Sequence, residues 1–276
     1  MNFKSRSDLW EQVTAALAGQ SSIDALYVYG SQVRNQADEY SDIDLVLCAN
    51  DLAGAETAVG QALTSVAEIV GTIHLLRRQD RFVQSVLLQG YSPYNKLDLA
   101  VTHSLDSERE FGPFSTVYKG NSPVSAKTSP APAGDWDDFL NDIYGILFSV
   151  PRFTKCLFRR DRALYKRWVG LLERIWALLF ERHFGWRQTY LAKISPPQHN
   201  RLQAALTDAE QRRLDSIIPP HGRLDLVASF RAGLSLLLQL AREKAAALDL
   251  FLDIKFAAFI EEFLRGEISR FQAQTV

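Results

Sequence analysis

The chain has 276 residues, of which 47% are hydrophobic, so it can bury a sizeable core in one large domain or two smaller ones. Its 31 basic and 32 acidic residues give a formal net charge of -1, so nothing points to a general nucleic-acid binder or a polybasic membrane adaptor. Cys48 and Cys156 stand in no paired spacing, which excludes a disulfide scaffold and favours a reducing cytoplasm. We expect no signal peptide and no membrane span, because no sufficiently long apolar stretch is present.

The N-terminal part of the chain alternates helical and strand-like patterns. Apolar residues recur at helical spacing over 7–18, with Ser7 as the predicted N-cap and Gly19 as the stop. Strands are predicted over 25–29, 43–48, 69–76, 82–88, 97–102 and 114–118, with a helix over about 55–66. The short connections over 77–81 and 90–95 favour hairpins, and therefore a mixed sheet.

A stretch rich in Ser, Pro and Gly over 104–134 indicates a domain boundary. Beyond it the pattern is almost wholly helical, and prolines such as Pro151 are the predicted breaks. The candidate helices lie over 136–149, 152–184, 198–205, 207–216, 224–247 and 250–273. We therefore predict an α+β chain: a mixed-sheet domain over 1–120, a linker over 121–135 and an all-α helical bundle over 136–276.

The segment LYVYGSQVRNQADEYSDIDLVL, residues 26–47, carries the chemistry. A strand runs into Gly30 and Ser31, ten residues follow, and Asp42 and Asp44 flank Ile43 at the start of the next strand. Because side chains alternate along a strand, both carboxylates point to one face. Like charges at that separation repel, so a hard divalent cation such as Mg²⁺ is their natural partner. Gly30 lets a phosphorylated substrate come close, and Ser31 offers its hydroxyl and amide at the start of a helix.

This pattern, G-S-x10-D-x-D between two strands, resembles the signature of the DNA polymerase β nucleotidyltransferase superfamily. The two-domain plan is similar to that of its small antibiotic-modifying members, the aminoglycoside and lincosamide adenylyltransferases. The resemblance implies a third carboxylate on a later strand, which the run KLDLAV assigns to Asp98. One departure is that Arg34 is followed by Asn35, where many relatives have glycine.

The resemblance further implies two Mg²⁺ ions held by Asp42, Asp44 and Asp98, with ATP or another NTP as co-substrate. Asp98 is then the candidate general base, or else an acid of the helical half, Glu173 or Asp142. Gly30, Ser31 and Arg34 become the nucleotide-binding residues of the first domain. The implied reaction transfers AMP to a hydroxyl of a small molecule and releases pyrophosphate.

The segment 152–187 holds ten Lys or Arg against three Asp or Glu. We predict that Lys155 and Arg159 contact the nucleotide phosphates, where a fixed cation stabilises the departing pyrophosphate. The alternative is an ordinary solvated helix surface with charge pairs four residues apart. An RNA acceptor would also favour such a stripe, but no RNA-binding motif accompanies it.

Two rivals to this function stay open at this point. One is a nucleotidyltransferase with a protein or RNA acceptor, and the other is a non-catalytic nucleotide-sensing or partner-binding module. The last helices are rich in Leu and Phe, which suits either internal packing or a homodimer face. We expect a small-molecule acceptor, no membrane partner and no nucleic-acid partner.

Overall fold

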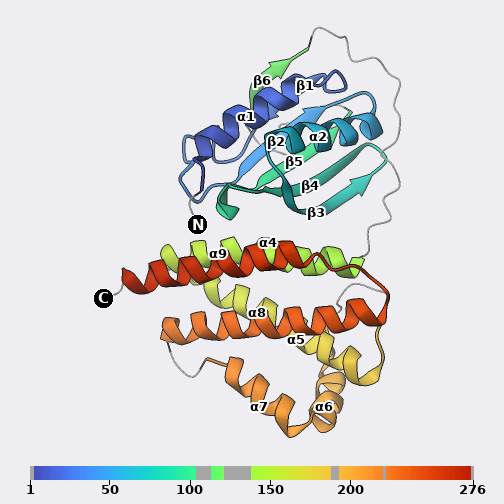
Figure 1. Ribbon diagram of the computed structural model, residues 1–276, viewed down its shortest axis with the longest axis vertical. Helices are drawn as coiled ribbons and strands as arrows, with labels where there is room; N and C mark the ends of the chain where they lie inside the picture. The colour runs from blue at the N-terminus through green and yellow to red at the C-terminus, as the bar shows by residue number, and fades with distance from the viewer. Residues whose placement is uncertain (1–2, 104–112, 121–137, 188–192, 220–221, 275–276) are drawn as a thin grey trace. The chain divides into compact units, whose positions relative to one another are not determined.

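The fold is described from a computed structural model that covers residues 3–103, 113–120, 138–187, 193–219 and 222–274 (Figure 1). The chain divides into two compact units, Met1–Asp135 and Trp136–Val276. The predicted linker over 121–135 lies outside the described residues.

Within the described residues of the first unit, six strands form one sheet in the order β3-β4-β5-β2-β1-β6. These strands are β1 Ala25–Val28, β2 Ile43–Cys48, β3 Ile69–Arg78, β4 Arg81–Leu88, β5 Leu97–Thr102 and β6 Ser115–Lys119. The central strands β2 and β5 are parallel, and the remaining neighbours are antiparallel. The predicted mixed sheet is therefore confirmed.

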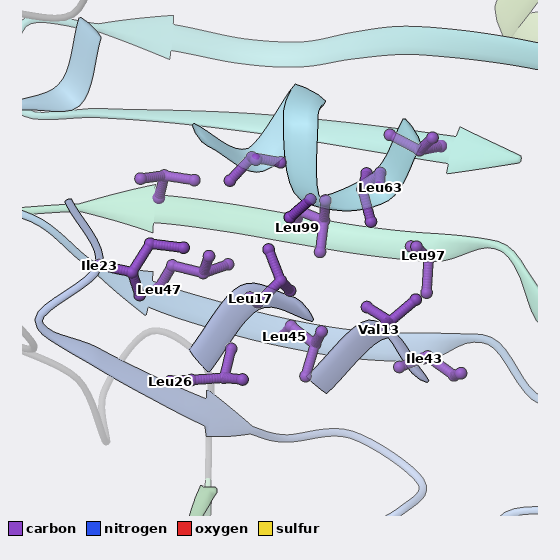
Figure 2. Close-up of a cluster of buried hydrophobic side chains, with 14 of the residues drawn as sticks. Val13, Leu17, Ile23, Leu26, Ile43, Leu45, Leu47, Leu63, Leu97 and Leu99 are labelled. Atoms are coloured by element: carbon purple, nitrogen blue, oxygen red, sulfur yellow. The ribbon is translucent and has the colours of Figure 1, made fainter. Parts of the chain in front are cut away.

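Two helices, α1 Arg6–Ala18 and α2 Leu52–Val66, cover one face of this sheet (Figure 1). Figure 2 shows how their apolar side chains meet those of the strands, for example Leu17 of α1 and Leu63 of α2 with Leu45 of β2 and Leu99 of β5. All four are completely buried. Because strand side chains alternate, the residues between these core positions point to the opposite face of the sheet.

Two local predictions in the first unit were wrong. The first helix is capped by Ser5, whose hydroxyl accepts a hydrogen bond from the Asp8 amide at 3.0 Å, and Ser7 lies inside the helix. The segment predicted as a charged connection over 77–81 mostly belongs to the strands, because Arg78 pairs with Arg81 across a two-residue turn. Two-residue turns are common in antiparallel hairpins, but they usually contain a glycine. This turn has none, so no sequence signal indicated it.

The second unit is helical in all of its described elements. These are α4 Asp138–Phe158, α5 Ala163–Phe184, α6 Pro196–Ala205, α7 Asp208–Ile217, α8 Gly222–Ala247 and α9 Ile254–Ala273. Helix α5 packs against α8, and α4 packs against α9. Phe153 of α4 stacks on Phe230 of α8 with ring centroids 3.6 Å apart. The fold class, a mixed-sheet unit followed by a mainly helical unit, is as predicted.

The predicted helix break at Pro151 was also wrong. Helix α4 runs through this proline and ends at Phe158, and the chain turns just beyond, where Arg160 adopts a positive φ of 53°. A proline inside a helix removes one main-chain hydrogen bond. Here it lies buried beside Val150 and Phe153, so the buried apolar face offsets that loss. None of the described helices combines the length and the apolar character that a membrane span needs.

Candidate functional site

Three aspartates come together on the face of the sheet that α1 and α2 leave uncovered. Asp42 directly precedes β2, Asp44 lies within β2, and Asp98 lies within β5. The parallel register places Asp44 directly beside Asp98. One carboxylate oxygen of each residue lies within 4.8 Å of the others. The neighbouring core residues Ile43 and Leu97 are completely buried, which fixes the opposite orientation of the aspartates.

Gly30 stands where no other residue fits. It follows β1 with a positive φ of 73°, and a Cβ atom there would lie 2.9 Å from the Asp44 side-chain carbon Cγ and closer still to its carboxylate oxygen. Asp44 therefore occupies the space that the missing side chain leaves. The adjacent Ser31 has a buried hydroxyl with no hydrogen-bond partner among the described residues. A buried unpaired donor suits a ligand oxygen such as that of a phosphate.

The Gly-Ser segment does not begin a regular helix, contrary to the prediction. It forms a single turn, in which the Gln36 amide donates to the Ser31 carbonyl at 3.0 Å. Asn35 closes that turn in the left-handed conformation, with a φ of 54°, and so stops helical propagation. The side chain of Arg34 donates to Gln36 at 3.3 Å, and its positive charge acts on Asp44 by lowering the pKa of that carboxyl.

Two residues that the sequence analysis did not single out hold the loop before β2. Arg6, the first residue of α1, donates to the main-chain carbonyls of Ser41 and Asp42, both at 3.2 Å, and to the Gln32 side chain at 2.8 Å. Asn95 donates to the Ser41 carbonyl at 3.1 Å. These contacts join the Gly-Ser turn to the start of β2. No local pattern announces them, because each partner lies more than 25 positions away in the sequence.

Lys96 is the third residue that the sequence analysis missed, and it touches the carboxylates themselves. Its ammonium donates to Asp98 Oδ2 and lies 3.1 Å from Asp42 Oδ2. The Ser85 hydroxyl donates to the other Asp98 oxygen, Oδ1. The side chain of Lys96 is only 6% exposed, against 14% for Asp98 and 30% for Asp42. Lys96 and Asp98 are two positions apart at the start of a strand, so their side chains are expected on the same face. This spacing is the sequence signal from which Lys96 could have been predicted.

Lys96 and Arg34 do not offset the effect of burial and of the neighbouring carboxylates on Asp44. The pKa of Asp44 is raised to about 7, mainly by burial. The charges of Asp42 and Asp98 also raise it, and those of Lys96 and Arg34 lower it. Burial also raises the pKa of Tyr29, with additional contributions from Asp44 and the other two carboxylates. Three converging carboxylates with a surplus of negative charge fit a divalent cation, and oxygen ligands are those that Mg²⁺ prefers.

The remaining predicted residues belong to the second unit. Lys155 lies in the last turn of α4, and the Arg159 amide donates to its carbonyl at 3.0 Å. The two alternative bases each face a cation: Asp142 lies 3.6 Å from Arg174, and Glu173 lies 2.9 Å from Lys193. The nucleotide-binding role of Lys155 and Arg159 stays a prediction.

Comparison with known proteins bears on the first unit. Residues 11–91 match the family model described as Polymerase beta, Nucleotidyltransferase. This part of the chain is similar to polymerase β-type nucleotidyltransferases. It contains Gly30, Ser31, Asp42 and Asp44 and ends before Asp98. The predicted resemblance to that superfamily is thus confirmed.

Among solved structures, an aminoglycoside 6-adenyltransferase from Bacillus subtilis is similar to the chain at 14% identity and a TM-score of 0.36. The similarity covers 96% of this chain and 99% of that protein. No curated protein sequence matches the chain.

Proposed function

We propose that the chain transfers a nucleoside monophosphate from a nucleoside triphosphate to a hydroxyl group of a small molecule. The single observation that carries the proposal is the convergence of Asp42, Asp44 and Asp98 within 4.8 Å, next to a Gly-Ser turn. The turn, Asp42 and Asp44 lie in the segment that matches the nucleotidyltransferase family. An isolated Asp-x-Asp at a strand end would be ordinary. A third carboxylate in register on the neighbouring strand, together with an unpaired Ser31 hydroxyl, is what nucleotidyl transfer requires.

The three aspartates are the residues that would hold two Mg²⁺ ions. When bound, such ions supply positive charge to the triphosphate and to the attacking and leaving oxygens. Gly30 lets the Asp44 carboxylate lie against the Gly-Ser turn, and the buried Ser31 hydroxyl beside it donates to a phosphate oxygen. Arg34 adds positive charge on the same side. Lys155 and Arg159 of the second unit are proposed to contact the β- and γ-phosphates.

The reaction is a substitution at the α-phosphorus. The acceptor oxygen forms a bond to phosphorus, the bond from phosphorus to the bridging oxygen breaks, and pyrophosphate leaves with that electron pair. The acceptor proton passes to a carboxylate, for which Asp98 is the first candidate because it belongs to the cluster. Asp142 and Glu173 are the alternatives, since each is an acid of the helical unit.

For the donor and acceptor we propose ATP and an aminoglycoside-like or lincosamide-like antibiotic. Both choices rest on the resemblance of the Gly-Ser and Asp-x-Asp motif to the antibiotic-modifying adenylyltransferases. A macromolecular acceptor and a non-catalytic nucleotide sensor are the outcomes that the experiment below distinguishes.

The test combines ligand binding with product formation. Wild type and Asp44→Asn are titrated with each of the four NTPs, with and without Mg²⁺, and the melting temperature is followed; a ligand that binds the native state raises it. Pyrophosphate release is then measured against a panel of aminoglycosides and lincosamides, and the acceptor mass is checked for a gain of one nucleotide. The proposal expects a Mg²⁺-dependent shift and a modified acceptor, both lost in Asp44→Asn. Nucleotide binding without release of pyrophosphate from the NTP, whichever small-molecule or macromolecular acceptor is added, would overturn it.

A further inference from the structure

Lys96 occupies an unusual position for a lysine in the first unit. Its side chain is 6% exposed, and its ammonium lies between Asp42 and Asp98. A buried ammonium needs charged or polar partners, because transfer out of water costs several kcal/mol for an unpaired ion. The partners here are two of the three carboxylates that converge on the face opposite α1 and α2.

The contacts leave Asp98 fully engaged by protein groups. Ser85 of β4 donates to Oδ1, and Lys96 donates to Oδ2. Position 96 cannot easily withdraw its backbone, since the Lys96 carbonyl accepts a hydrogen bond from the Ile43 amide at 2.9 Å. The contact between Lys96 and Asp98 Oδ2 is therefore broken by side-chain movement and not by displacement of the Lys96 backbone. A cation that binds to Asp98 through this oxygen must first displace the ammonium.

The charge count of the site points the same way. One ammonium contacts two of the three carboxylates, and the charges of Arg6 and Arg34 also act on Asp44. The ammonium thus reduces the repulsion among the aspartates without saturating the site. A divalent ion brings twice the charge of the ammonium to the same oxygens, so its binding is favourable. Because it must displace the ammonium, its net binding free energy is reduced.

We propose that Lys96 is an internal counter-cation, which holds Asp42 and Asp98 together in the metal-free protein and competes with a divalent metal ion for their oxygens. This inference rests on the proposed function, because the metal is the cofactor of that reaction. It assigns to Lys96 a role in setting metal affinity. A purely structural lysine would leave that affinity unchanged.

The experiment measures Mn²⁺ binding by isothermal titration calorimetry at pH 8.5, without nucleotide, together with the melting temperature of the metal-free protein. The variants are Lys96→Met, which removes the charge, and Lys96→Gln, which keeps a hydrogen-bond donor for Asp98. Lys96→Arg retains the charge, and Lys119→Met is the matched control because Lys119 is an exposed lysine of the same unit. Asp44→Asn serves as the reference for a damaged metal site.

We expect Lys96→Met and Lys96→Gln to bind Mn²⁺ about tenfold more tightly than wild type, since the competing charge is gone. Their metal-free melting temperatures fall below that of wild type. Saturating Mn²⁺ then raises the melting temperature of these variants by more than it raises that of Lys119→Met. Lys96→Arg stays close to wild type. If Lys96→Met does not fold, Lys96→Gln decides the question.

Unchanged or weaker Mn²⁺ binding in the neutral variants would overturn the inference, because Lys96 would then support the carboxylates without competing for them. Failure of the proposed function has a different signature. In that case neither wild type nor any Lys96 variant binds Mn²⁺ more tightly than Asp44→Asn does.

Discussion

The two units each bury a lysine against carboxylates, and the two clusters differ in charge balance. In the second unit, Lys244 of α8 is 0% exposed and donates to Glu181 of α5 at 2.7 Å, and its ammonium lies 4.3 Å from the ring centroid of Phe139. One positive charge there meets one negative charge. In the first unit, Lys96 meets two members of a cluster of three aspartates.

The difference separates a structural ion pair from a cation-binding site. The pair of Lys244 and Glu181 is closed, since the remaining acceptor capacity of Glu181 Oε2 is directed at the Arg187 amide at 3.3 Å. In the aspartate cluster, burial is the main cause of the raised pKa of Asp44, and the negative charges of Asp42 and Asp98 add to it. Burial of a lysine is therefore no guide to function by itself, and the charge surplus around it is the informative quantity.

The largest effect is expected at the unbalanced cluster. Asp44→Asn removes a ligand from the proposed metal site, and loss of several kcal/mol of charge stabilisation corresponds to a fall in kcat on the order of 10³-fold. The free energy of unfolding is retained or rises, because a buried charge among like charges is gone. Pyrophosphate release and denaturant unfolding of the same preparation check both parts. An active Asp44→Asn enzyme would contradict the assignment.

Breaking the balanced pair should give the opposite profile. Lys244→Met leaves the buried Glu181 carboxylate without its ammonium, and removal of one partner of a buried pair costs about 3–5 kcal/mol of unfolding free energy. The double variant Lys244→Met with Glu181→Leu should recover most of that loss. Urea unfolding measures it, with the exposed Lys255→Met as control. Equal destabilisation of Lys244→Met and the double variant would show that packing, not charge, dominates there.

Gly30→Ala tests the space beside Asp44. The methyl group would collide with the Asp44 carboxylate, and a non-glycine residue at a φ of 73° is strained, so we expect a loss of about 1–3 kcal/mol in stability. Mn²⁺ affinity should fall as well, because Asp44 must move. Gly90→Ala is the matched control: it has a φ of 82° but open space around the new atom. If Gly90→Ala weakens Mn²⁺ binding as much, the contact with Asp44 is not the cause.

The smallest effect is a pH dependence of metal binding. The pKa of Asp44 is about 7 in the folded metal-free protein, against 3.8 as its ordinary value. Between about pH 4 and 7 the folded state retains a proton that the unfolded state has lost, so metal-free stability falls as pH rises through that window. Metal competes with this proton. Mn²⁺ affinity should rise by up to about tenfold per pH unit below pH 7 and level off above it. Calorimetry across pH checks this, and the slope should shrink in Asp44→Asn.

Much of this organisation is readable from the sequence. Periodicity predicts the strands, and the spacing of Gly30, Ser31, Asp42 and Asp44 predicts the carboxylate pair, because a strand holds alternate side chains on one face. Asp98 was predicted because the resemblance implies a third carboxylate on a later strand, and the run KLDLAV supplies one. The parallel pairing of β2 with β5, which sets Asp98 beside Asp44, is a property of the sheet and only appears in the fold.

The residues that were missed are those whose roles depend on distant partners. Lys96 is recognisable once the register of β5 is known, because it shares a face with Asp98. Arg6 contacts Gln32 and Asp42 only because the first turn of α1 lies near the start of β2. The helix break predicted at Pro151 was wrong for a related reason. A proline costs the helix one main-chain hydrogen bond, and the burial of the apolar face of α4 outweighs that cost.

The central claim is that the unbalanced carboxylate cluster, and not the balanced pair, is a divalent-cation site. Anomalous diffraction from crystals soaked in Mn²⁺ with a non-hydrolysable NTP analogue tests it most directly. The account predicts manganese within ligand distance of Asp42 and Asp44, with the Lys96 ammonium withdrawn from Asp98, and no manganese at Glu181. Manganese confined to other carboxylates would contradict it. So would manganese bound at the aspartate cluster while the contact between Lys96 and Asp98 is unchanged.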